Sequence, residues 1–107
     1  MNEVPEMEGS ASRRQRVIQL VRLAVDDLRS LGVEARIFGS LAAGSFGDRS
    51  DVDFLVVSCP SELKYTIEGR VEDRLGDLPF DVVYLDEIPP DRIERFTRHA
   101  VEASRLS

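Results

Sequence analysis

Two aspartates open an otherwise apolar segment, and this pattern constrains the fold more than any other feature of the sequence. Asp51-Val52-Asp53 leads directly into a run of apolar residues that ends at Val57. Side chains alternate between the two faces of a strand, so both aspartates are expected on the same side of one strand. Core packing does not favour two like charges placed together. A divalent cation would remove their repulsion, and paired carboxylates suit Mg²⁺ together with substrate phosphates.

A structural interpretation of this pair is also open, because Ser50-Asp51 is a typical turn dipeptide. Two further features favour a functional interpretation. Gly39-Ser40 lies upstream at a predicted strand-to-helix turn, where main-chain N–H groups and a hydroxyl can hold a phosphate. Asp81 lies inside another apolar segment, where a charge is costly unless it is exposed or has a partner.

The apolar periodicity predicts an α/β (α+β) domain, with a small mixed sheet of about three strands flanked by helices. A short connection between the first two strands suits antiparallel pairing. A long helix between the second and third favours a parallel pair with a right-handed crossover, which would place Asp81 beside Asp51 and Asp53. The expected order is α-β-α-β-α-β-α, with a helix over 12–31, a strand over 33–38, a helix over 40–46, a strand over 51–57, a helix over 61–75, a strand over 80–85 and a final helix that opens at 89–91 and includes Ala103.

Length and composition indicate one domain. The chain has 107 residues, and we expect residues 1–11 to form a flexible tail before a domain spanning 12–107. The net charge of −6 argues against extended nucleic-acid binding. Cys59 is the single cysteine, which excludes an intramolecular disulfide, and we interpret it as a packing residue. Without an apolar run of membrane length or a signal-peptide core, the sequence predicts a cytoplasmic protein.

A basic cluster near the start of the first helix has two interpretations. Arg13, Arg14 and Arg16 could form a patch for nucleic acid, or they could lie on a solvated helix face. The acidic residues that follow, Asp26 and Asp27 among them, favour the solvated face.

The combination of Gly39-Ser40, Asp51-x-Asp53 and Asp81 resembles the nucleotidyltransferase superfamily of DNA polymerase beta, and most closely its minimal nucleotidyltransferases. The resemblance runs from the first helix to the third strand and implies the nucleotidyltransferase fold. It also implies two Mg²⁺ ions and ATP as substrate. The three aspartates would be the catalytic and metal-binding residues, and Gly39 and Ser40 would bind phosphate.

One position departs from the family pattern. Many relatives carry an Arg directly after Gly-Ser, whereas this chain has Leu41-Ala42-Ala43, which removes one expected triphosphate contact. Arg49, just before the acidic pair, is a candidate substitute, and the neighbouring Ser50 is a further candidate nucleotide contact.

The resemblance also implies a partner. Minimal nucleotidyltransferases are often paired with a helical HEPN-type protein, and in such toxin–antitoxin pairs they act as antitoxin and can transfer AMP from ATP to a tyrosine of the toxin. We therefore expect a Mg²⁺-dependent protein adenylyltransferase with a HEPN-like partner. Two alternatives remain open. The chain could be a catalytically weak module that neutralises its partner by contact, or a small-molecule (antibiotic) adenylyltransferase acting with a second subunit.

Overall fold

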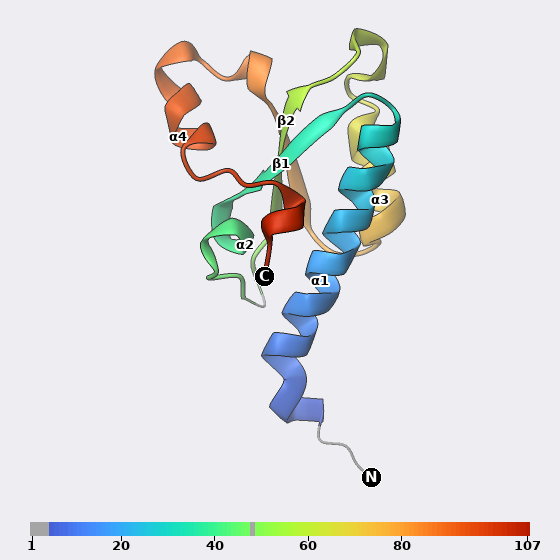
Figure 1. Ribbon diagram of the computed structural model, residues 1–107, viewed down its shortest axis with the longest axis vertical. Helices are drawn as coiled ribbons and strands as arrows, with labels where there is room; N and C mark the ends of the chain where they lie inside the picture. The colour runs from blue at the N-terminus through green and yellow to red at the C-terminus, as the bar shows by residue number, and fades with distance from the viewer. Residues whose placement is uncertain (1–4, 48) are drawn as a thin grey trace.

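A three-stranded sheet forms the centre of the molecule (Figure 1). The structure is a computed structural model that describes residues 5–47 and 49–107. β1 pairs antiparallel with β2, and β2 pairs parallel with β3, so both predicted pairings are confirmed. The helices and strands are α1 (Pro5–Ser30), β1 (Glu34–Phe38), α2 (Gly39–Ala43), β2 (Val52–Ser58), α3 (Ile67–Leu75), β3 (Phe80–Tyr84) and α4 (Ile93–Thr97).

The hydrophobic core lies between one face of the sheet and the helices α1 and α3. Alternate residues of β2 and helical residues at three- and four-residue steps point into it, as the amphipathic patterns require. The contributing side chains include Val17, Val21 and Leu28 of α1, Val52, Phe54 and Val56 of β2, and Ile67, Val71 and Leu75 of α3. Burying one such side chain is worth about 1.5–3 kcal/mol, so this layer holds the sheet and helices together.

The opposite face of the sheet is covered over only part of its area. Phe38 of β1 packs edge-to-face against Phe96 of α4, with ring centroids 5.5 Å apart. Leu55 of β2 is buried on this face. Asp51 and Asp81, at the starts of the parallel strands, are exposed. The acidic end of this face is therefore open to solvent.

α1 begins earlier than the sequence predicts. It starts at Pro5 rather than at Ser12, so the later part of the predicted tail is helical, while residues 1–4 of that tail lie outside the described residues. Proline suits the first helical position because its missing N–H would have no helical partner there. No helix in the described part of the chain is both long and apolar enough to cross a membrane.

The continuous helix predicted over 61–75 is wrong. Ser61–Leu63 forms a separate 3₁₀ turn, and α3 begins only at Ile67. Tyr65, between them, has φ 69°, a left-handed conformation that a right-handed helix cannot contain. Its main-chain N–H donates to Tyr84 Oη at 3.0 Å, so the third strand fixes this break.

The predicted final helix also ends early, at Thr97. Val101 instead pairs with Ile37 on the outer edge of β1, and each N–H donates to the other's carbonyl at 2.8 Å. Ala103 therefore lies beyond the helix rather than on its apolar stripe, in a segment that runs on against α1 (Figure 1). The unpaired edge of β1 offers main-chain partners that a continued helix would leave unused.

Candidate functional site

The parallel pairing of β2 and β3 brings two of the predicted aspartates side by side. Asp53 and Asp81 are register partners, and neighbouring strands lie about 4.8 Å apart. Asp51 directly precedes β2, and its negative charge also acts on Asp53. The three predicted acidic residues thus gather at one end of the sheet.

Asp53 has the most perturbed environment of the three. Burial raises the pKa of its carboxyl above the ordinary value, and the negative charges of Asp81 and Asp51 raise that pKa further. Within residues 5–47 and 49–107, none of the three carboxylates forms an ion pair. The ionised site therefore lacks a positive partner within the described fold.

Gly39 makes room for the Asp53 carboxylate. A Cβ built at Gly39 would lie 2.1 Å from Asp53 Oδ2, far closer than non-bonded atoms approach. Gly39 also has φ 73°, in the left-handed region that glycine adopts without strain. Phe38, the preceding residue, is the register partner of Asp53 across β1 and β2. Two independent constraints thus require glycine where the first strand meets the acidic site.

Ser40 follows Gly39 in α2 and is half-buried. The next residue, Leu41, is fully buried and anchors this short helix in the core. Two further candidate nucleotide contacts, Arg49 and Ser50, lie later in the connector. Arg49 is exposed, whereas Ser50 Oγ accepts the Gly47 N–H at 2.9 Å and so closes a turn of the connector. The structure thus gives the Ser50 hydroxyl a local structural contact.

The carboxylates fit a divalent cation by their chemistry, although their side chains do not surround a single point. Among the described residues, no three His, Cys, Asp or Glu side chains are close enough to bind one metal ion. Asp51 and Asp81 are exposed, so their side chains can rotate towards Asp53 without disturbing the core. Carboxylate oxygens on neighbouring strands suit Mg²⁺, which proteins usually bind through one or two carboxylates together with substrate phosphates.

Sequence reasoning missed two arginines that contact the connector. Arg14 Nη2 donates to the carbonyl of Leu41, and Arg13 Nη1 donates to that of Gly47, both at 3.4 Å. Of the three clustered arginines, only Arg16 lies on the solvated face that we expected. The basic cluster was the only signal in the sequence, because the contacts join segments far apart in the chain.

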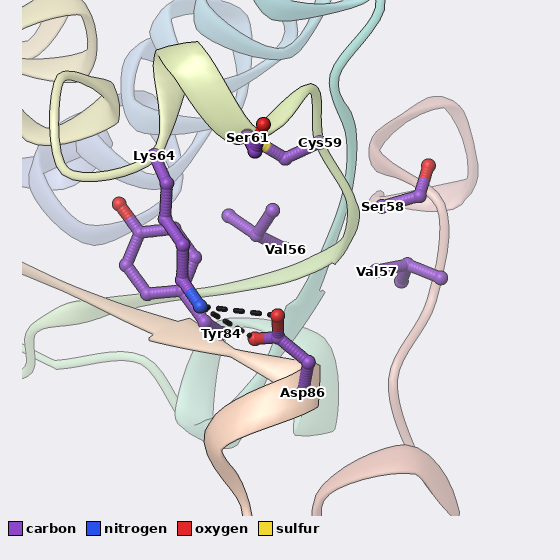
Figure 2. A pocket seen from close by; sticks show the side chains of 8 residues that line it. All are labelled: Val56, Val57, Ser58, Cys59, Ser61, Lys64, Tyr84 and Asp86. Atoms are coloured by element: carbon purple, nitrogen blue, oxygen red, sulfur yellow. Dashed lines mark hydrogen bonds and ion pairs between the residues drawn. The ribbon is translucent and has the colours of Figure 1, made fainter.

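A second polar cluster lies at the other end of β2 and β3, beside a cavity of about 350 Å³ (Figure 2). Lys64 Nζ lies 3.0 Å from both carboxylate oxygens of Asp86 and 3.1 Å from Glu87 Oε2. Cys59 lines this cavity and is half-buried, and burial raises the pKa of its thiol. A thiol with a raised pKa is a poor nucleophile, which fits the packing role predicted for Cys59.

Comparisons with known proteins identify a family. A family model described as "Nucleotidyltransferase domain" matches residues 18–103, a range that contains Gly39, Ser40 and the three aspartates. A solved structure described as that of a "putative minimal nucleotidyltransferase" is 25% identical to this chain, with a TM-score of 0.54. That likeness covers 78% of this chain and 93% of the other. No curated protein matches the chain.

Proposed function

The chain belongs to the nucleotidyltransferase domain family, and on this premise we propose that it transfers AMP from ATP to a hydroxyl group of a partner protein with the aid of Mg²⁺. The observation that carries the proposal is the position of Asp53, which lies against Gly39 and in register with Asp81. Packing does not explain a half-buried carboxylate beside two like charges. A site for a cation and a triphosphate explains why these three carboxylates gather at one place.

Each residue of the motif has a role in this proposal. Asp51, Asp53 and Asp81 would hold two Mg²⁺ ions, which when bound neutralise the charge that develops on the phosphate oxygens. Gly39 leaves space for the Asp53 carboxylate and for close approach of a phosphate to the main chain. Ser40 contributes its hydroxyl and N–H to the phosphates. The carboxylates would thus bind the metal ions, and the Ser40 hydroxyl and N–H would bind the phosphates of the same substrate.

The proposed reaction is an in-line displacement at the α-phosphorus of ATP. The acceptor oxygen forms a bond to this phosphorus while the bond to the oxygen that bridges the α- and β-phosphates breaks. Pyrophosphate leaves with the electron pair of the broken bond, and the acceptor's proton passes to Asp81. The products are the AMP ester of the acceptor and pyrophosphate, so no further reactant is needed.

We further propose that the acceptor is a tyrosine hydroxyl on a HEPN-like helical toxin, for which this chain is the antitoxin. The openness of the acidic end supports an acceptor supplied by another protein, because Asp51 and Asp81 are exposed there. A HEPN-like partner is what the resemblance of the motif to minimal nucleotidyltransferases implies, and a similar solved structure is described as a "putative minimal nucleotidyltransferase".

A binding module that neutralises its partner by contact alone is the second candidate function. Leu41 stands where many relatives carry an Arg, which removes one triphosphate contact. The three carboxylates also do not surround one point among the described residues. In this second function the aspartates would be dispensable.

Intact mass spectrometry of the partner separates the two functions. The test protein is the proposed HEPN-like partner, incubated with the chain, ATP and Mg²⁺. We expect a mass increase of one or more AMP groups, reduced at least about a thousandfold in rate by Asp53→Ala, which removes a metal ligand. Asp73→Ala, which removes an exposed aspartate of α3, is the matched control and should transfer normally. An unchanged partner mass, together with full neutralisation by the Asp53→Ala protein, would falsify the enzymatic proposal.

A further inference from the structure

The segment that carries Gly39 and Ser40 needs support from the rest of the chain. We call residues 39–47, which include α2, the α2 turn. α2 has five residues, and a helix this short does not persist alone in water. The turn closes on itself by two hydrogen bonds, from Gly44 N–H to Leu41 O at 3.4 Å and from Ser45 N–H to Ser40 O at 2.9 Å. Leu41 anchors one side of the α2 turn in the core, and its carbonyl oxygen has a second lone pair that can accept a further donor from outside the turn.

Arg14 of α1 supplies such a donor. Its Nη2 donates to Leu41 O at 3.4 Å and to Ser107 O at 2.6 Å, and its Nε donates to Ser107 O at 2.9 Å. A guanidinium near the C-terminal end of a helix is also favoured by the helix dipole. The planar fork of arginine lets one side chain hold two main-chain segments together.

Arg13 holds the far end of the α2 turn. Its Nη1 donates to Gly47 O at 3.4 Å, and its guanidinium lies 5.5 Å from the centroid of the Phe46 ring. A guanidinium over an aromatic face is attracted by the negative face of the ring, so this contact adds to the hydrogen bond. The two neighbouring arginines of α1 therefore contact both ends of the stretch that leads from Ser40 towards the aspartates.

Residues 101–107, the C-terminal segment, brace the other side of this assembly. Val101 pairs with Ile37, shortly before the α2 turn begins. Arg22 of α1 donates to Ala103 O at 3.1 Å and to Leu106 O at 2.5 Å, so it fixes this segment without reaching α2. Of these two arginines, Arg14 is the one whose hydrogen bonds join the segment to the α2 turn.

We propose that Arg14, assisted by Arg13, is a positioning residue that holds the α2 turn so that Gly39 stays against Asp53 and Ser40 stays next to Gly39 at the acidic site. Its consequence for nucleotide binding rests on the proposed function, whereas the clamp itself rests on the contacts above. Arg14 acts through the main chain of Leu41 and does not touch the reacting atoms. Loosening the clamp should therefore weaken nucleotide binding without unfolding the core.

Amide hydrogen exchange tests the clamp without any assay of activity. We expect Arg14→Met to speed exchange within residues 39–47 about tenfold or more while α3 and β3 keep their protection, because only local opening becomes easier. Arg22→Met is the matched control, and it should speed exchange mainly in residues 101–107. If Arg14→Met does not fold, Arg14→Lys serves instead, since it keeps the charge and one donor. Equal exchange in the α2 turn of the wild type and the Arg14 variant would overturn the clamp.

Binding of ATP with Mg²⁺, measured by calorimetry, tests the positioning role. We expect Arg14→Met to weaken ATP affinity about tenfold, Arg14→Lys to weaken it less, and Arg22→Met to change it less than about twofold. Unchanged affinity in an Arg14→Met protein whose α2 turn exchanges fast would overturn the positioning role and keep the clamp as structural. A wild-type protein that binds no ATP would overturn the proposed function and the positioning role together, leaving hydrogen exchange to judge the clamp.

Discussion

The two ends of the parallel strand pair differ in whether their charged side chains have partners within the described fold. At the starts of β2 and β3, Asp53 and Asp81 are register partners, and neither forms an ion pair with another described residue. At the other end, Lys64 bridges Asp86 and Glu87, and its ammonium lies 5.4 Å from the Tyr84 ring centroid. The charged groups around Lys64 have partners within the fold, so their role is to stabilise the structure. Charge left without a partner is available to a ligand, and groups of this kind cluster at functional sites.

The tyrosine hydroxyl groups near Lys64 also have hydrogen-bond partners within the chain. Tyr84 Oη accepts the Tyr65 N–H and donates to Glu68 Oε1 at 3.1 Å. The Tyr65 hydroxyl donates to Glu87. Partners within the chain thus occupy the polar groups around Lys64, whereas the acidic end offers its oxygens to solvent.

The largest change to this contrast should come from Gly39→Ala. The new methyl would collide with the Asp53 carboxylate, and φ 73° strains any residue with a Cβ. We expect a loss of about 1–3 kcal/mol in the free energy of unfolding, together with loss of nucleotide transfer.

Gly44→Ala is the matched control for this prediction, because Gly44 has φ 84° but no atom within 4 Å of an added Cβ. It should show the backbone strain alone and keep nucleotide transfer. Urea unfolding and the transfer assay measure both quantities. Equal loss of transfer in the two variants would contradict the role assigned to the Asp53 contact.

Tyr84→Phe should destabilise the end of the strand pair that contains Lys64 without affecting the acidic end. It removes one hydrogen-bond acceptor and one donor, and we expect a loss of about 1 kcal/mol in the free energy of unfolding with unchanged nucleotide transfer. The thermal midpoint should fall by about 4–8 °C. Reduced transfer at an unchanged midpoint would argue that the two ends are coupled.

Tyr84 also predicts a dependence on alkaline pH. Burial raises the pKa of its hydroxyl to about 12 from an ordinary 10.0; the Tyr65 N–H opposes this rise and Glu68 adds to it. A folded-state pKa above the unfolded one means that this stabilisation is present below pH 10 and is lost as pH rises towards 12. The difference in stability between wild type and Tyr84→Phe should therefore shrink over that interval. A constant difference from pH 9 to 12 would count against the buried hydroxyl as its cause.

The smallest effect on stability, and one of opposite sign, is expected from Asp53→Asn. The pKa of Asp53 is raised in the folded state, which means that the ionised carboxylate opposes folding. The free energy of unfolding therefore increases as pH falls through this folded-state pKa. Because solvent screens a carboxylate that is only partly buried, removing the charge should stabilise the protein at neutral pH only slightly, by less than about 1 kcal/mol.

The same variant should lose any response to Mg²⁺. A metal bound only by the native state raises the thermal midpoint by mass action, and Asp53→Asn removes one of its ligands. We expect millimolar Mg²⁺ to raise the midpoint of the wild type and to leave that of the variant unchanged. Identical midpoints of the wild type with and without Mg²⁺, in the presence of ATP, would weigh against a metal site.

Much of the fold was predictable because its signals are local. The alternation of Asp51-Val52-Asp53-Phe54 specifies a strand with an acidic face, and the crossover rule then places Asp81 beside it. The nucleotidyltransferase fold and the family followed from the same motif and are confirmed. The roles of the individual residues remain predictions.

The missed features depend on contacts between distant segments. Leu63 and Ile67 have helical spacing, yet the hydrogen bond from Tyr65 to Tyr84 breaks the helix between them. Residues near Ala100 have helical spacing too, but the free edge of β1 draws Val101 into the sheet. No local pattern announces such partners.

The pairing of Val101 with Ile37 has a consequence for the order of folding. This contact and the one from Arg14 to Ser107, which spans 93 positions, close long loops, whereas β2, α3 and β3 are contiguous in sequence. Closing a long loop has an entropic cost before any contact rewards it, and contacts of high sequence separation slow folding. We therefore expect the strands that carry the aspartates to assemble first and the α2 turn to become ordered late. In a partly folded chain, Asp53 and Asp81 would then be in register before Gly39 and Ser40 could bind a phosphate.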